Sequence, residues 1–122
     1  MDLSSFWKDV LSKNRAALPS YFCEDAVIRW HCTNEHFSVS EFVRANCDYP
    51  GEWEGMIERA EESGDLLISV VKVFPRDRSA SFHAVSFFVM KEGRIRTLDE
   101  YWADDGDAPA WRKRMGIGRP IR

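Results

Sequence analysis

The second half of the sequence consists of four apolar segments separated by short turns, and this pattern restricts the fold more than any other feature. From Trp53 onward apolar and polar residues alternate with a period of about two, and turn residues occur at SGD (63–65), PRDRS (75–79) and KEGR (91–94). Such alternation is typical of half-buried strands, and the connections are short enough for an antiparallel meander. The predicted strands cover residues 53–62, 66–74, 80–91 and 94–103.

The first half of the sequence has helical patterns instead. Leu3, Phe6, Val10 and Leu11 recur at helical spacing and predict an amphipathic helix over about residues 4–16.

A break follows at Pro19, and PSYF is typical of a short second helical segment that ends before Asp25. AVIRWHC, residues 26–32, is rich in β-branched and aromatic residues and predicts a strand.

A capping box marks the start of a third helix. Ser38 is followed three residues later by Glu41, and Phe37 and Phe42 occupy the positions of a hydrophobic staple. The helix should end at about Cys47, before the DYPG turn. Three helices, an early strand and a long meander predict an α+β domain in which helices cover one face of a curved sheet.

Length and charge exclude several function classes. The chain has 122 residues, 44% of them hydrophobic, and a formal net charge of −3. We therefore expect one domain over residues 1–122, with no nucleic-acid partner. No segment approaches the roughly 20 apolar residues of a membrane span, and no signal-peptide pattern begins the sequence, so we expect a cytoplasmic protein without a membrane partner.

The cysteines and the acidic tail give weaker signals. Cys23, Cys32 and Cys47 have no C-x-x-C spacing, so reduced thiols buried as small hydrophobes are the simplest interpretation. A metal site with Cys32, His36 and Cys23 remains an alternative, although its spacing matches no established ligand pattern. We expect no metal and no cofactor.

The acidic segment ADDGDAP precedes the basic segment WRKRMGIGRPIR. These two segments can pair with each other or with another subunit, and the acids are most simply a solvated turn. A magnesium site built from Asp104, Asp105 and Asp107 is an alternative, but no glycine-fixed loop pattern surrounds them.

The last hairpin brings carboxylates into an apolar environment. If Glu92 and Gly93 are the central turn residues, Met90 faces Ile95. The same register then pairs Leu98 with Phe87, Glu100 with Val85, and Trp102 with His83. Six side chains then share one face, and Asp99 lies on the other. They are His83, Val85, Phe87, Leu98, Glu100 and Trp102.

This face predicts a ligand pocket with His83 and Glu100 as candidate acid–base groups, because a few polar groups among apolar walls are typical of such sites. The alternative is that both groups are simply hydrogen-bonded within the structure. A shift of one residue would exchange the faces and give the role to Asp99.

The segment HCTNEHFSVSEFVRANCDYPGEW, with the strand before it, supplies further candidates for the pocket mouth. Asn34 and Glu35 also fit a turn before a helix, and Trp53 also fits the core. The candidate ligand-binding residues are Trp30, Asn34, Glu35, Asn46, Tyr49, Trp53, Phe87 and Trp102.

The segments GRIRTLDEYWADDGDAPAWR and YFCEDAVIRW resemble the last strand and the first helix-to-strand junction of the nuclear transport factor 2-like superfamily, in its SnoaL-like branch. The order of helices and strands resembles that superfamily over nearly the whole chain. The resemblance implies a cone-shaped, curved antiparallel sheet around N-terminal helices, with a pocket open at one end and a dimer formed through the outer sheet face.

The resemblance also implies possible activities. Relatives include ketosteroid isomerases, polyketide cyclases, scytalone dehydratase-like proteins and limonene epoxide hydrolases, which work without metal, and members that only bind ligands or proteins. An isomerase-type Tyr/Asp pair or an epoxide hydrolase Arg/Asp arrangement does not align onto this sequence. The expectation is therefore a small-molecule-binding domain for an apolar or aromatic ligand, with cofactor-free isomerase or lyase chemistry on a carbonyl compound as one form and a non-catalytic binding or interaction module as the alternative.

Overall fold

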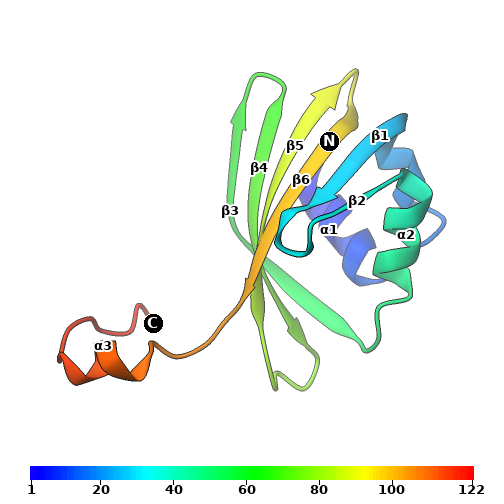
Figure 1. Ribbon diagram of the computed structural model, residues 1–122. Helices are drawn as coiled ribbons and strands as arrows, with labels where there is room; N and C mark the ends of the chain where they lie inside the picture. The colour runs from blue at the N-terminus through cyan, green and yellow to red at the C-terminus, as the bar shows by residue number, and fades with distance from the viewer.

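Four long strands occupy the second half of the chain, and they form one curved sheet with a fifth and a sixth strand from the first half (Figure 1). The computed structural model describes residues 1–122. The strands are β1 (Phe22–Trp30), β2 (Glu35–Phe37), β3 (Trp53–Ser63), β4 (Leu66–Pro75), β5 (Phe82–Lys91) and β6 (Arg94–Asp104). The helices are α1 (Leu3–Leu11), α2 (Val39–Cys47) and α3 (Ala110–Arg114), with single 3-10 turns η1 (Leu18–Tyr21) and η2 (His31–Thr33).

The order of the strands in the sheet is β2-β1-β6-β5-β4-β3. Strands β3 to β6 form the predicted antiparallel meander, whereas β1 lies beside β6 in parallel. This parallel pairing brings the early strand next to the last one, with Trp30 opposite Glu100. The aromatic end of β1 and the acidic segment of β6, 70 residues apart in sequence, therefore become neighbours.

Local capping interactions determine where the helices begin. The Ser38 hydroxyl accepts a hydrogen bond from the Glu41 backbone N–H at 3.3 Å, and the Glu41 carboxylate accepts one from the Ser38 N–H at 2.9 Å. The predicted capping box is thus confirmed, and α2 ends at Cys47 as expected. Helix α1 is shorter than predicted: it ends at Leu11, and Lys13 has a left-handed φ of 58° that turns the chain away.

The core lies between the helices and the concave face of the sheet. In Figure 1, α1 and α2 lie on the same side of the sheet. Phe6 of α1 packs edge to face against Phe22 of β1 and Phe88 of β5, and Phe22 packs against Phe42 of α2. These four rings are almost completely buried, so aromatic contacts join both helices to the sheet.

A β-bulge in β6 changes the predicted register. The turn at Glu92 and Gly93 has positive φ at both residues, and Met90 pairs with Ile95 as predicted, but Val89 pairs with Thr97. The intervening residue on β6 is therefore extra, and every later pair is shifted by one. The shifted pairs are Leu98 with Phe88, Glu100 with Ser86, and Trp102 with Ala84.

The predicted common face of His83 and Glu100 is wrong for this reason. Leu98, Glu100 and Trp102 face the concave side, whereas His83, which pairs with Ala103, lies on the outer face. Val85 and Phe87 share that outer face.

The sequence pattern did not indicate α3. It follows β6 in a segment that extends away from the sheet (Figure 1). No helix in the structure has the length and apolar character needed to cross a membrane.

Candidate functional site

A cavity of about 200 Å³ lies on the concave side of the sheet, between α1, the loop after α2 and the ends of β1, β5 and β6. Its walls are mainly aromatic, and its few polar groups include the Glu100 carboxyl group. Six of the predicted site residues line it: Trp30, Asn46, Tyr49, Trp53, Glu100 and Trp102. The volume is below the roughly 300–1,000 Å³ of pockets for drug-sized ligands, so the cavity fits a small molecule.

Glu100 is the acidic group most strongly removed from water. Only 6% of its surface is exposed, and two donors reach its carboxyl group: Trp30 Nε1 at 3.0 Å and Ser86 Oγ at 2.5 Å. No cation contacts it. Burial raises the pKa of Glu100, and the hydrogen bonds from Ser86 and Trp30 oppose this effect only in part.

The tryptophans around the cavity differ in whether their indole N–H groups donate hydrogen bonds within the protein. Trp7 donates to Ser69 Oγ at 3.1 Å, Trp53 donates to the Pro50 carbonyl at 2.8 Å, and Trp30 donates to Glu100. Trp102 also lines the cavity, and its indole N–H makes no hydrogen bond with the protein and is accessible to solvent. Trp102 is therefore the tryptophan that can donate to a bound oxygen atom.

Two other predicted residues contribute polar groups to the cavity wall. The Asn46 side-chain nitrogen donates to the Phe42 carbonyl at 2.9 Å, so one of its N–H bonds is already used. Tyr49 is about half exposed at the rim, and its ring packs against Trp53 at 5.4 Å. Its hydroxyl has no partner within the protein and can turn toward a ligand.

His83 does not line the cavity. On the outer face, its Nε2 lies 2.8 Å from Glu58 of β3, and its Nδ1 contacts Asp105. The prediction placed His83 beside Glu100 because it assumed a hairpin without a bulge. The imidazole instead connects β3, β5 and the segment that follows β6.

The other three predicted ligand-binding residues also lie outside the cavity. Asn34 adopts a left-handed conformation at the end of η2, and Glu35 is exposed on β2. Phe87 is on the outer face, where it packs edge to face with Tyr101 at 6.1 Å. The alternative interpretation as a turn residue is confirmed for Asn34 but is wrong for Glu35, which begins a strand and pairs with Trp30.

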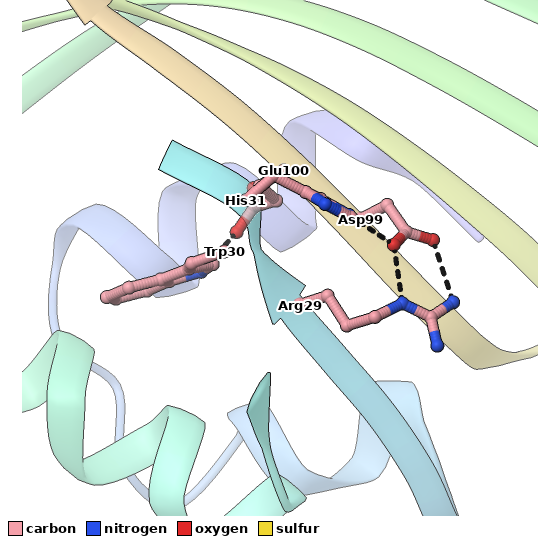
Figure 2. A network of polar contacts seen from close by, with 5 residues as sticks. All are labelled: Arg29, Trp30, His31, Asp99 and Glu100. Atoms are coloured by element: carbon pink, nitrogen blue, oxygen red, sulfur yellow. Dashed lines mark hydrogen bonds and ion pairs between the residues drawn. The ribbon is translucent and has the colours of Figure 1, made fainter. Parts of the chain in front are cut away.

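Asp99 and Glu100 point to opposite sides of β6, as Figure 2 shows. The Asp99 carboxylate accepts hydrogen bonds from Arg29 Nε at 2.7 Å and Arg29 Nη2 at 3.2 Å, and its Oδ1 lies 2.7 Å from His31 Nε2. The Arg29 guanidinium holds the pKa of Asp99 below its usual range, with a smaller contribution from His31. Asp99 is thus a charged group of the outer surface.

Several cavity residues were not among the predicted site residues. Trp7 and Leu11 belong to the apolar face of α1, and Phe82 and Ala84 belong to β5. The position of Trp7 at the margin of the apolar stripe was the one available signal. The two β5 residues could not be recognised without knowledge of the bulge.

A wider, shallower groove of about 740 Å³ adjoins the cavity and shares Trp7, Leu11, Lys13 and Trp53 with it. Two of its three bases have partners within the protein: Lys13 Nζ donates to the Tyr49 carbonyl and, at 2.7 Å, to the Gly51 carbonyl, and Arg76 pairs with Glu52 at 3.0 Å. The groove contains no buried ionisable group comparable to Glu100. We therefore place the candidate site in the smaller cavity and regard the groove as its open approach.

No protein-family model matches the sequence, and no curated protein matches it. Solved structures do match the fold. A candidate ketosteroid isomerase from Kribbella flavida has a TM-score of 0.80 and 17% identity, and the match covers 97% of this chain and 87% of that one. An NTF-2 like protein of unknown function from Burkholderia xenovorans has a TM-score of 0.78 and 18% identity, with 97% and 91% covered.

A third structure, a candidate SnoaL-like polyketide cyclase from Shewanella putrefaciens, has a TM-score of 0.66 and 11% identity, with 83% of this chain and 75% of that chain covered. At these identities the likeness concerns the fold. The six-stranded curved sheet and its helices, together with these neighbours, confirm the predicted architecture: the chain has the cone fold of the nuclear transport factor 2-like superfamily, with SnoaL-like proteins among its structural neighbours.

Proposed function

We propose that the chain binds a small apolar carbonyl compound in the cavity and converts it by cofactor-free acid–base chemistry, as an isomerase, cyclase or dehydratase. The observation that carries the proposal is the buried Glu100 carboxyl group, which faces an apolar cavity without a cation beside it. Structural neighbours described as a candidate ketosteroid isomerase and a candidate polyketide cyclase support the same class of chemistry.

In this proposal Glu100 moves a proton between two carbon atoms of the ligand. The ionised carboxylate removes a proton from the carbon beside the carbonyl group, and the electron pair moves into an enolate. The protonated Glu100 then returns the proton to another carbon of the conjugated system, so atoms and charge balance. A raised pKa suits this role because the group can both accept and release a proton.

The developing negative charge on the ligand oxygen requires a donor. Trp102 Nε1 and the Tyr49 hydroxyl are the cavity donors without a partner in the protein, and Asn46 has one free N–H. Ser86 and Trp30 hold the carboxyl group in place from the side of the sheet. His83 has no part in this mechanism, because it lies on the outer face.

The alternative function is ligand binding without turnover. Both Glu100 oxygens already accept hydrogen bonds from the protein, which also fits a structural role for the carboxyl group. The aromatic walls formed by Trp30, Trp53 and Trp102 could hold a flat ligand by stacking alone.

The test uses a panel of small β,γ-unsaturated ketones, with formation of the conjugated enone followed by ultraviolet absorbance. Glu100→Gln should reduce the rate by about 10²–10⁴-fold, as is usual for loss of a general acid–base group, while quenching of tryptophan fluorescence still reports binding. The matched control is Asp99→Asn on the adjacent residue, which should leave the rate within about twofold because its side chain faces outward. Unchanged turnover in Glu100→Gln would remove Glu100 from the mechanism. Binding without conversion in the wild type would favour the alternative function.

We also propose a homodimer formed through the outer sheet face, and a cytoplasmic location. Apolar side chains cover the centre of that face: Ile68, Val70, Val85, Phe87 and Tyr101. These residues remain partly exposed in the single chain, and such a patch is typical of an interface. The three free cysteines fit a reducing compartment.

A further inference from the structure

Beyond Asp105, which contacts Ser81 and His83, the segment after β6 makes almost no contact with the rest of the chain. We call residues 105–122 the C-terminal arm; it contains α3 and extends away from the sheet (Figure 1). Four large apolar side chains of the arm face solvent: Trp111 is 57% exposed, Met115 59%, Ile117 55% and Ile121 95%. An arm of this composition has no apolar partner in its own chain.

Past Asp105, polar contacts hold the arm to the rest of the chain at one point only. Residues 108–122 make one polar contact with the body, between Arg122 Nη2 and Glu58 Oε2 at 4.0 Å. The remaining contacts are internal, such as Lys113 with Asp107 at 3.6 Å and the Arg112 guanidinium over the Trp111 ring at 5.6 Å. A five-residue helix with such contacts is too short to be stable in isolation.

Two of the structural matches extend over nearly the whole chain. The matches to the Kribbella and Burkholderia proteins cover 97% of this chain, which leaves about four residues outside the matched span, so most of the 18-residue arm lies within it. The Shewanella match covers 83%. The exposed apolar side chains of the arm need a surface that covers them.

Charge indicates which surface can do so. Residues 108–122 contain five bases and no acid. The outer face of β3 carries Glu54, Glu58 and Glu61, of which Glu61 pairs with Arg59 at 3.0 Å and Glu58 with His83 at 2.8 Å. Met56 lies among them, opposite Lys72 of β4, and is 56% exposed. This region offers both carboxylates for the bases and apolar surface for Trp111. The groove on the helix side carries three bases, Lys8, Lys13 and Arg76, against one acid, Glu52, and would repel the arm.

We propose that the C-terminal arm docks on the β3 side of the outer sheet face of a second copy of the chain. Two arms related by a two-fold axis would each cover the sheet of the other copy. Trp111 and Ile117 would supply apolar contacts, and Arg112, Lys113 and Arg114 would pair with the glutamates of β3. The inference is independent of the chemistry in the cavity.

The first experiment uses the full-length wild-type chain and its five lysines, which are Lys8, Lys13, Lys72, Lys91 and Lys113. Equal amounts of ¹⁴N-labelled and ¹⁵N-labelled protein are equilibrated and treated with a lysine-reactive cross-linker. We expect cross-links between Lys113 and Lys72 that join a light peptide to a heavy one, because Lys72 lies on the outer face. If all such cross-links join peptides of the same label, or if the mixed ones join Lys113 to Lys8 or Lys13, the proposal is wrong.

The second experiment exchanges the charges. The arm variant R112E/K113E/R114E and the sheet variant E54K/E58K/E61K should each associate with themselves at least tenfold more weakly than the wild type in analytical ultracentrifugation. A mixture of the two should restore a heterodimer, because each arm then meets a sheet of opposite charge. The control E24K/D25K/E35K changes exposed acids of β1 and β2 and should associate as the wild type does. If both variants fold but do not associate when mixed, the arm does not bind the other copy in this way. The cross-linking experiment uses the wild-type chain, so its result does not depend on whether the variants fold.

Discussion

Asp99 and Glu100 are adjacent in the sequence, yet their carboxyl groups have opposite electrostatic environments. Asp99 lies beside the Arg29 guanidinium on the outer face, which lowers its pKa. Glu100 faces the cavity, where loss of water raises its pKa. Alternation along one strand therefore shifts the pKa values of two neighbouring acids in opposite directions.

The first prediction concerns the pH dependence that Glu100 gives to stability. Because its pKa is raised in the folded state, its contribution is complete below the unfolded pKa of about 4.3 and is lost as the pH rises through the folded pKa. Gln at this position carries no charge at any pH, so Glu100→Gln should be more stable than the wild type at neutral pH, with the difference vanishing near pH 4. Urea unfolding of both proteins over this range measures it, and a difference that does not change with pH would contradict the raised pKa.

The second prediction is that Asp99 contributes to stability with the opposite pH dependence. The pKa of Asp99 is lowered, so its stabilising contribution is present above about pH 3.9 and is lost as the pH falls through the lower folded value. Asp99→Asn should cost up to about 1 kcal/mol at neutral pH, since the pair with Arg29 is partly exposed, and nothing in strong acid. Arg15→Gln, which removes an exposed pair with Asp48, serves as the comparison and should change stability less. Equal costs at all pH values would exclude the ion pair as the cause.

Side-chain type was sufficient to identify some of the cavity residues but not others. Trp30 and Trp102 were recognisable because aromatic residues on strands that end near an acid are typical of pocket walls. His83 could not be placed correctly, because its face depends on the strand pairing and not on its own chemistry. The free indole N–H of Trp102 depends on which neighbours use the other donors, and no sequence pattern reports that.

At the scale of elements, strand boundaries were more predictable than strand register. The turn residues bounded all four meander strands to within two residues, and Glu92-Gly93 formed the expected two-residue turn. The extra residue Arg96 on β6 then shifted the pairing. Arg96 is polar and exposed, as an alternating strand residue would be, so composition gives no sign of the bulge.

The third prediction tests the element whose start was clearest in the sequence. Ser38→Ala removes the side-chain acceptor for the Glu41 N–H and should cost about 1 kcal/mol. Helix α2 contributes Phe42 to the core and Asn46 to the cavity, so ligand binding should weaken together with stability. Thermal unfolding followed by circular dichroism measures the cost, and Ser63→Ala at the exposed end of β3 is the control. A melting temperature equal to that of the control would mean that the cap contributes nothing.

The whole molecule depends on one contact that is remote in sequence, the parallel pairing of β1 with β6. This pairing closes one side of the cone and brings Trp30 to Glu100. The family resemblance predicted the architecture, whereas periodicity alone predicted only helices on a sheet. Local patterns do not encode which strands become neighbours, because the pairing is selected by burial of both halves at once.

The fourth prediction concerns assembly. If two copies associate through the outer face, the melting temperature should rise with protein concentration, because association stabilises only the folded chain. Val85→Asp places a charge at the centre of that face, where Val85 pairs with Val70 and Tyr101, and should abolish the concentration dependence. Arg94→Asp, beyond the apolar patch at the β5–β6 turn, changes an exposed residue and should leave the dependence intact. Scanning calorimetry over a hundredfold range of protein concentration measures this dependence. If the wild-type melting temperature stays constant and sedimentation shows the mass of a single chain, no second copy binds to this apolar face.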